Sequence, residues 1–193
     1  MIPRLVTGPL HESLGKGKAI VLLGPRQVGK TTLLLDLLEK DTSGLYLDCD
    51  EPDIRKRLTE PTSADIKNLI GDHHLVIIDE AQRIKNIGLA AKIMVDKFKG
   101  VQFILSGSSA LELSNAINEP LTGRKFEFLL LPFSTRELVQ QYGRLEEQRQ
   151  LEQRLIYGFY PEIVLHPADA RERLSDLVSG YLCTDIFTYE AVS

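Results

Sequence analysis

The sequence predicts an α/β protein in which a parallel sheet of five strands is covered by helices on both faces, as a three-layer sandwich. Short apolar runs alternate with helix-like segments as far as residue 131, and this alternation is typical of a parallel sheet. A loop with two glycines follows the first run, and two adjacent acids end the third. Beyond residue 131 the sequence reads as helices without further strands.

The strand candidates are short apolar runs with turn residues around them. They cover residues 20–23, 45–48, 76–79, 102–106 and 125–131. The segments between them fit helices: residues 31–40 are rich in strong helix formers, and residues 86–99 carry one apolar stripe. The stripe consists of Ile87, Ala90, Ala91, Met94, Val95 and Phe98. We interpret it as core packing against the sheet.

The helical part begins after Pro132, which interrupts the strand pattern. Ser134 and Glu137 have the spacing of a capping box, so a helix is expected to start there. Residues 146–157 predict one charged helix whose charges serve solvation. We therefore divide the chain into a core at residues 1–131 and a helical, lid-like segment at residues 132–193.

Composition limits the possible functions. The chain has 193 residues, of which 43% are hydrophobic, enough for one substantial core. A net charge of -4 argues against bulk affinity for nucleic acid. Cys49 and Cys183 lack the spacing of a metal site, and we interpret them as reduced thiols. The chain shows no signal-peptide segment and no run of about 20 apolar residues, so a cytoplasmic location without membrane insertion is expected.

The loop after the first strand fits the phosphate-binding pattern G-x-x-x-x-G-K-S/T. It lies between a strand and a helix, where its N–H groups and the helix dipole converge on a phosphate. Lys30 is expected to reach the β and γ oxygens of a nucleoside triphosphate, and the Thr31 hydroxyl to hold magnesium. Arg26 either touches the nucleotide or points to solvent. The candidate nucleotide-binding residues are Gly24, Pro25, Arg26, Gln27, Val28, Gly29, Lys30, Thr31 and Thr32.

The acids of the third strand, Asp79 and Glu80, support the same site. Because ligands bind at the carboxyl ends of parallel strands, both are expected near the loop. Asp79 then steers magnesium through its water shell, and Glu80 polarises the water that attacks the γ-phosphorus. The alternative is that the two acids cap the helix that follows.

The motifs GPRQVGKTT, IIDEAQR, FILSGSS, LTGRKFEFLLLPFS and GFYPEI occur in this order. Together they resemble the bacterial and archaeal AAA-like P-loop ATPases, whose ATPase domain usually precedes a C-terminal domain of uncharacterised function. The likeness covers roughly residues 2 to 165. It implies ATP and Mg²⁺ as ligands and a sheet order of 5-1-4-3-2, in which the fourth strand lies between the loop strand and the acidic strand.

The resemblance also implies roles for single residues. Ser108 matches the sensor position that binds the γ-phosphate or the attacking water, with Ser106 as the second choice. Arg124 matches an arginine that this family carries before its last core strand. It either neutralises charge at the phosphates, in its own subunit or a neighbour's, or forms a structural salt bridge.

The chain departs from the family pattern at two places. Phe159 stands where the family usually has a glycine, which questions a nucleotide-sensing role for that turn. Residues 177–187 resemble the first helix of the C-terminal domain, yet the chain ends at Ser193. A truncated C-terminal domain is therefore expected, with exposed apolar surface that favours self-association.

The sequence favours an ATPase with Lys30, Glu80, Ser108 and Arg124 as catalytic residues and with Thr31 and Asp79 at the metal. An ATP-gated interaction switch with negligible turnover uses the same residues, and the ATPase component of a DNA-associated system is a third possibility. The expected partners are ATP, further copies of the chain, and a C-terminal domain or another protein.

Overall fold

The computed structural model describes residues 2–39, 43–107, 113 and 117–182. Contacts divide the chain into two compact units. The core unit comprises Leu5–Pro25 and Gly29–Leu130, and the helical unit comprises Met1–Arg4, Arg26–Val28 and Leu131–Ser193. The predicted domains, 1–131 and 132–193, stay a prediction. The compact units differ from it in grouping the first residues and the apex of the phosphate loop with the helices.

The core unit is built on a parallel sheet of five strands in the order β2-β3-β4-β1-β5. The strands are β1 (Ala19–Leu23), β2 (Gly44–Asp48), β3 (Leu75–Asp79), β4 (Gln102–Gly107) and β5 (Lys125–Leu129). This confirms the α/β class and the order 5-1-4-3-2. β1 pairs with β4 and β5, and β3 pairs with β2 and β4. The central strands β1 and β3 are buried along their whole length, which explains their unbroken apolar runs.

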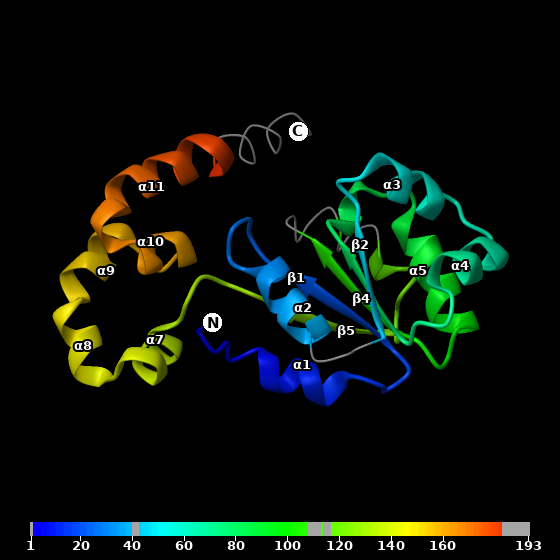
Figure 1. The fold of residues 1–193 in the computed structure, drawn as a ribbon, viewed down its shortest axis with the longest axis horizontal. Helices are drawn as coiled ribbons and strands as arrows, with labels where there is room; N and C mark the ends of the chain where they lie inside the picture. Colours follow the sequence, from blue (N-terminus) through cyan, green and yellow to red (C-terminus); the bar gives the residue numbers. More distant parts are fainter. Residues whose placement is uncertain (1, 40–42, 108–112, 114–116, 183–193) are drawn as a thin grey trace. The chain divides into compact units, whose positions relative to one another are not determined.

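Helices cover both faces of this sheet. On one face, Val21 and Ile78 belong to a buried cluster that includes residues of α3 (Pro52–Leu58), α4 (Ser63–Ile70) and α5 (Ile87–Lys97). On the other lie α1 (Thr7–Ser13) and α2 (Lys30–Glu39), which bury Leu10, Leu33, Leu34 and Leu37. Figure 1 shows the two groups of helices on opposite sides of the strands. The three-layer arrangement is confirmed.

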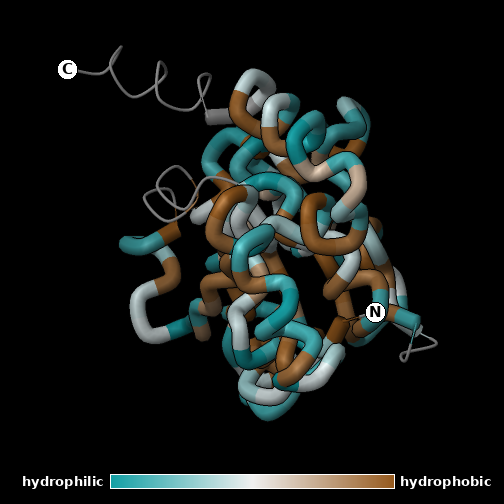
Figure 2. Tube along the Cα trace, turned by 90° about the vertical axis from the view of Figure 1, so that its left-hand side faces the viewer, coloured by the Kyte–Doolittle hydropathy of each residue, from teal (hydrophilic) through white to brown (hydrophobic). Residues whose placement is uncertain are grey.

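Helix α5 shows how the sequence pattern becomes packing. Its predicted stripe is buried at Ile87, Ala90, Ala91, Met94 and Val95, and Phe98 packs against the same cluster while partly buried. The opposite side keeps Leu89 exposed. Figure 2 shows hydrophobic and hydrophilic stretches alternating along the helices, as amphipathic helices require.

The helical unit has no strand among the described residues 131–182. Its helices are α7 (Thr135–Tyr142), α8 (Arg144–Arg149), α9 (Leu151–Tyr157), α10 (Pro161–Leu165) and α11 (Ala170–Leu177), with a 3₁₀ turn, η2 (Pro167–Asp169), and a π turn, η3 (Val178–Leu182). Its apolar cluster contains Ile2, Phe133, Leu138 and Val164, with Phe159 packed against it. The capping box at Ser134 and Glu137 is confirmed.

The prediction of one continuous charged helix over residues 146–157 is wrong. The helix breaks at Gln150, which separates α8 from α9. Glu147 on α8 and Arg154 on α9, one on each side of this break, form an ion pair of 3.1 Å. Their side chains are only 5% and 6% exposed, so these two charges serve packing rather than solvation.

No helix within the described ranges combines the length and the hydropathy that crossing a membrane requires.

Candidate functional site

The phosphate loop connects β1 to α2 and contains two left-handed residues, Gln27 at φ 61° and Gly29 at φ 92°. Alternation of right-handed and left-handed residues turns successive backbone N–H groups toward one side of a loop, which creates an anion-binding nest. Gly29 adopts its conformation without strain because it lacks a Cβ atom. Val28, between the two, is fully buried, whereas Arg26, Gln27, Thr31 and Thr32 are exposed.

Lys30 lies at the start of α2 and is 5% exposed. Its ammonium group donates hydrogen bonds to the carbonyl oxygens of Gly24, at 2.9 Å, and Pro25, at 3.0 Å. The side chain therefore folds back over its own loop. A buried ammonium group needs such acceptors, and phosphate oxygens would serve it as well.

Asp79 is the centre of the polar network at the carboxyl edge of the sheet. Its Oδ2 accepts hydrogen bonds from the Thr31 hydroxyl, at 2.7 Å, and the Tyr46 hydroxyl, at 2.6 Å. Its Oδ1 accepts from the Glu80 backbone N–H, at 3.0 Å, and from the Ser106 hydroxyl. Parallel pairing explains the gathering, because β3 lies between β2 and β4 and all three end at this edge.

The hydrogen bonds decide the protonation of this carboxylate. Burial alone would raise the pKa of Asp79, since a charge is less stable away from water. The donors Ser106, Tyr46, Thr31 and the Glu80 N–H together outweigh burial and hold the pKa below its ordinary value. Asp79 is therefore a carboxylate at neutral pH, as a magnesium ligand must be.

Tyr46 is a site residue that the sequence analysis missed. It lies on β2, opposite Ile77 of β3, and its hydroxyl reaches Asp79. Burial, and then the hydrogen bond to Asp79, raise the pKa of Tyr46, so the phenol stays a donor. A tyrosine within an apolar run carries no motif, and only the strand pairing reveals its role.

Glu80 follows Asp79 in the left-handed conformation, at φ 52°. It precedes the short turn η1 (Ala81–Arg83), but its side chain makes no capping hydrogen bond to that turn. One carboxylate oxygen accepts a hydrogen bond from the Gln82 amide instead. The capping alternative is thus not supported for Glu80, and Gln82 is a second residue that the sequence analysis missed.

Gly107 at the end of β4 leaves the space in which Gln82 lies. A Cβ atom there would come within 2.7 Å of Gln82 Oε1 and 2.6 Å of Leu113 Cδ2. The sensor candidate Ser108 lies outside the described residues. The second choice, Ser106, is fully buried and donates its hydroxyl to Asp79, so it positions the carboxylate directly.

Arg124 lies at the amino edge of the sheet, where the strands begin, and the phosphate loop lies at the carboxyl edge, where they end. The N–H of Ala19, at the start of β1, donates to the Arg124 carbonyl, whereas the phosphate loop follows the end of β1. Five residues of strand span roughly 16 Å. The Arg124 guanidinium instead pairs with Asp96 at 2.8 Å, and both side chains are partly exposed. This placement supports the salt bridge and does not bring Arg124 to its own subunit's loop.

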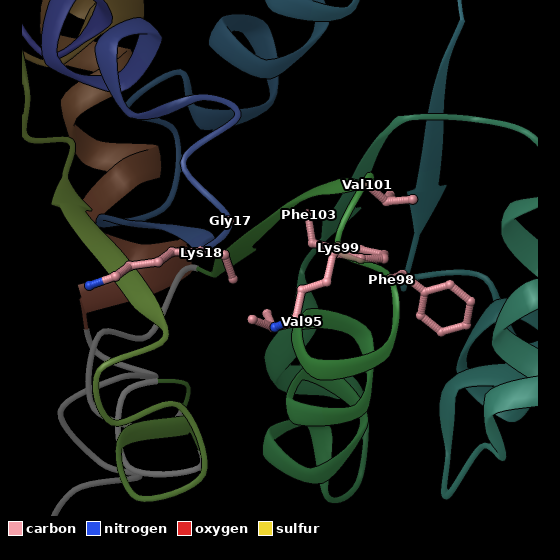
Figure 3. A pocket seen from close by; sticks show the side chains of 8 residues that line it. Gly17, Lys18, Val95, Phe98, Lys99, Val101 and Phe103 are labelled. Carbon is pink, nitrogen blue, oxygen red and sulfur yellow. The ribbon is translucent and has the colours of Figure 1, made fainter.

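The amino edge also holds a small cavity of about 10 Å³, lined by Gly17, Lys18, Ala19, Val95, Phe98, Lys99, Val101 and Phe103. Figure 3 shows the Lys18 ammonium directed away from the other labelled side chains. It lies 5.1 Å from the Phe126 ring centroid, as a cation–π contact. A space that holds at most about one water is too small for a nucleotide.

Cys49, just after β2, is fully buried. Its N–H donates to the Asp79 carbonyl at 3.1 Å. Burial, reinforced by Asp48 and Asp79, raises the pKa of the Cys49 thiol to about 12. The thiol is therefore an unreactive packing group at neutral pH.

The donor set fits a magnesium–nucleotide ligand. Magnesium prefers oxygen ligands and is usually held by one or two protein oxygens together with phosphates and water. Thr31 Oγ1 and Asp79 Oδ2, 2.7 Å apart, offer these oxygens beside the loop. Across the described residues, no three His, Cys, Asp or Glu side chains gather as a metal cage. The phosphates and water would therefore supply most of the coordination.

Comparisons with known proteins agree with this geometry. The AAA domain family matches residues 16–139. Two uncharacterised proteins, from Mycobacterium bovis and Mycobacterium tuberculosis, are each 34% identical over 116 residues, covering 60% of this chain and 25% of the relative. The chain thus matches about a quarter of the length of these curated relatives.

A solved structure, the Walker-type ATPase PABY2304 of Pyrococcus abyssi, superposes with a TM-score of 0.67. The superposition covers 100% of this chain and 77% of the Pyrococcus abyssi chain, and the two sequences are 19% identical. Identity this low supports the fold alone. With the loop, the acidic strand and the sheet order in place, the chain belongs to the AAA domain family and has the fold of a P-loop ATPase.

Proposed function

We propose that the chain binds Mg·ATP at the carboxyl edge of its sheet and hydrolyses it to ADP and phosphate. The observation that carries this proposal is the meeting of the Thr31 hydroxyl with the Asp79 carboxylate, at 2.7 Å, next to the buried Lys30. These residue types at these positions hold magnesium and cradle phosphates in P-loop enzymes. Magnesium, when bound, supplies charge neutralisation at the phosphate oxygens.

Lys30 and the loop do the binding. The ammonium group exchanges its hydrogen bonds to the Gly24 and Pro25 carbonyls for bonds to the β and γ oxygens. The loop N–H groups and the N-terminus of the ten-residue helix α2 add positive potential at the same place. Negative charge on the phosphates is thereby stabilised from several directions.

Glu80 is the candidate general base. Its carboxylate accepts a proton from the water that attacks the γ-phosphorus, while the bond from that phosphorus to the bridging oxygen of ADP breaks. Gln82, through its amide, holds one oxygen of this carboxylate. The other oxygen is left to face the water.

The test is steady-state phosphate release from Mg·ATP, combined with ATP binding measured by calorimetry. We expect Glu80→Gln to abolish release while ATP still binds, and Lys30→Ala to remove most of the binding. Glu127→Gln, a matched acid-to-amide change at a partly exposed acid on β5, should leave both unchanged. If Lys30→Ala binds ATP as tightly as the parent, the loop assignment is wrong. Binding without turnover in the parent would support an ATP-gated switch instead.

Arg124 enters this proposal only through a second copy of the chain. Because it lies at the amino edge, it can reach a γ-phosphate only in a neighbouring subunit. Turnover per molecule that rises with protein concentration, and that is lost in Arg124→Gln, would support this role. A further domain, a protein partner and a cytoplasmic location, all expected from the sequence, stay predictions.

A further inference from the structure

A buried arginine near the start of the chain contacts the phosphate loop. The Arg4 side chain is 6% exposed, and its Nη1 donates to the Val28 carbonyl at 2.8 Å. Its Nε donates to Glu137 Oε1 at 3.1 Å, and its Nη2 donates to the Leu131 carbonyl. The guanidinium carbon also lies 4.6 Å from the Phe133 ring centroid. We call these five residues the Arg4 cluster, and all of them belong to the helical unit.

The cluster requires arginine rather than lysine. Burying a charged group is costly unless an opposite charge and hydrogen bonds compensate for it. The planar guanidinium directs its donors along fixed, diverging directions and stacks on an aromatic ring, which a lysine ammonium cannot reproduce. Each nitrogen of Arg4 has a different acceptor, one of them a carboxylate. The side chain is therefore built to hold three backbone or side-chain groups in one arrangement.

Glu137 connects this arrangement to the start of α7. Its Oε1 pairs with Arg4, while its Oε2 accepts from the Ser134 N–H at 2.8 Å and from the Ser134 hydroxyl at 3.1 Å. Both oxygens of one buried carboxylate are thus occupied. Leu138, the next residue, packs in the apolar cluster with Ile2 and Phe133. The first turn of α7 and the first residues of the chain are held together.

The contact with Val28 matters for the phosphate because of peptide geometry. The Val28 carbonyl and the Gly29 N–H belong to one rigid peptide plane and point in opposite directions. Fixing the carbonyl on Arg4 therefore also fixes the direction of the Gly29 N–H, on the far side of the plane. Gly29 is one of the two left-handed residues that form the nest of N–H groups.

We propose that Arg4 is a positioning residue of the phosphate loop and that, through Glu137, it couples nucleotide binding to the first turn of α7. Arg4 does not touch the nucleotide. It holds the Val28–Gly29 peptide in the orientation that a phosphate needs. By reciprocity, a phosphate that accepts a hydrogen bond from the Gly29 N–H strengthens the contact between the Val28 carbonyl and Arg4. This inference rests on the proposed binding of Mg·ATP.

The test compares Arg4→Gln and Arg4→Lys with Arg154→Gln, measuring Mg·ATP affinity by calorimetry. Arg154 is a matched control, because it is also a buried arginine of the helical unit, 6% exposed and paired with a glutamate, but its guanidinium binds Glu147 and not the loop. We expect both Arg4 variants to bind Mg·ATP about tenfold more weakly, the effect of one charge-assisted hydrogen bond. The Arg154 variant should stay within about twofold of the parent.

A second readout separates positioning from general stability. Hydrogen exchange of the amides in residues 135–142 should slow when Mg·ATP is added to the parent, and this response should disappear in Arg4→Gln. Glu137→Gln serves the same purpose if the Arg4 variants do not fold, because glutamine keeps one acceptor oxygen for the Ser134 N–H and presents its NH2 to Arg4, so the hydrogen bond from Arg4 is lost. Its expected result is a weaker response of these amides to nucleotide.

The outcomes distinguish the two proposals. If Lys30→Ala abolishes binding while Arg4→Gln binds like the parent and keeps the exchange response, the inference on Arg4 is overturned and the ATP site stands. If Lys30→Ala leaves binding unchanged, the proposed function fails first. Equal losses in Arg4→Gln and Arg154→Gln would show that only the stability of the helical unit matters, and would also overturn the inference.

Discussion

The two edges of the sheet in the core unit use their polar residues in opposite ways. At the carboxyl edge, Asp79 is 2% exposed and accepts hydrogen bonds from three hydroxyl groups and a backbone N–H. At the amino edge, Asp96 pairs with Arg124. The Arg124 side chain is 41% exposed and the Asp96 side chain is 35% exposed. Both acids have a lowered pKa, Asp79 through hydrogen bonds that outweigh burial and Asp96 mainly through its hydrogen bond from Arg124. A shifted pKa alone therefore does not mark a functional site, and burial with several donors is the informative difference.

The largest expected difference between the edges is in activity. If Asp79 attracts magnesium as proposed, Asp79→Asn removes the charge that does so, and we expect Mg-dependent phosphate release to fall roughly 100-fold or more. Asp96→Asn is the matched change at the amino edge and should keep release within about twofold of the parent. The measurement is turnover over a range of magnesium concentrations. Equal losses in the two variants would contradict the assignment of the metal site to the carboxyl edge.

The same two variants sharpen the comparison in acid. Because the pKa of Asp79 in the folded chain lies below its unfolded value, its contribution to stability is present above the unfolded pKa and is lost as the pH falls through the folded one. The stability difference between parent and Asp79→Asn should therefore shrink below about pH 4. The pKa of Asp96 is lowered as well, through its hydrogen bond from Arg124. Because this ion pair is exposed, salt should screen it and reduce its contribution to stability. Urea unfolding across pH, at low and high salt, would separate the buried case from the exposed one.

Steric changes at the carboxyl edge should come next in size. We expect Gly107→Ala to destabilise the fold by about 1–3 kcal/mol, because the new Cβ atom would collide with Leu113 and Gln82. It should also displace the Gln82 amide from Glu80 and so lower turnover. Gly100→Ala has no atom within 4 Å of its new Cβ and serves as the control. Thermal unfolding of the two variants checks this, and equal stability would argue against tight packing behind Glu80.

A single hydroxyl at the site should have a smaller effect. Tyr46→Phe removes one donor to Asp79 and keeps the ring, so we expect about 0.5–1.5 kcal/mol of lost stability. With one donor fewer, the pKa of Asp79 should rise, and the acid loss of stability should begin at a higher pH. Tyr142→Phe, a partly exposed tyrosine of α7, is the control. An unchanged acid profile in Tyr46→Phe would show that Thr31 and Ser106 suffice to hold the carboxylate.

The smallest effect belongs to the Arg124–Asp96 pair. An exposed ion pair contributes little to stability, so Arg124→Gln should leave the urea midpoint of unfolding nearly unchanged. At low protein concentration, turnover should also be unchanged. A loss of turnover at low concentration would place Arg124 at its own subunit's phosphates, contrary to its position before β5.

The sequence predicted most of the core and brought the residues of two motifs to one end of the sheet. Strand positions were found because buried parallel strands are unbroken apolar runs. The motifs predicted that Asp79 lies near the loop, and its hydrogen bond from Thr31 agrees with this, while the roles of Lys30, Thr31 and Asp79 toward phosphate and magnesium stay predictions. Their order in the sheet came from the family resemblance, since apolar runs do not state which strand lies beside which. The structure then confirmed it.

Residues defined by pairing across the chain could not be predicted. Tyr46 reaches Asp79 because β2 lies beside β3. The hydrogen bond from Gln82 to Glu80 forms in a turn where Glu80 is left-handed, a backbone conformation that the residue type does not announce. The break at Gln150 escaped detection because its flanking residues favour a helix, while the ion pair between Glu147 and Arg154 depends on packing. Arg4 lies 133 positions before Glu137, and no local pattern joins them.

The buried thiol of Cys49 offers a practical way to watch this core open. Alkylating reagents attack the thiolate, and Cys49 is both inaccessible in the folded chain and held protonated by a pKa of about 12. Its labelling must therefore wait for the strand ends around Asp79 to separate, and the labelling rate measures how often they do. A tightly bound nucleotide that bridges the loop and Asp79 would slow that labelling. The labelling rate of Cys49 would then report whether the site is occupied.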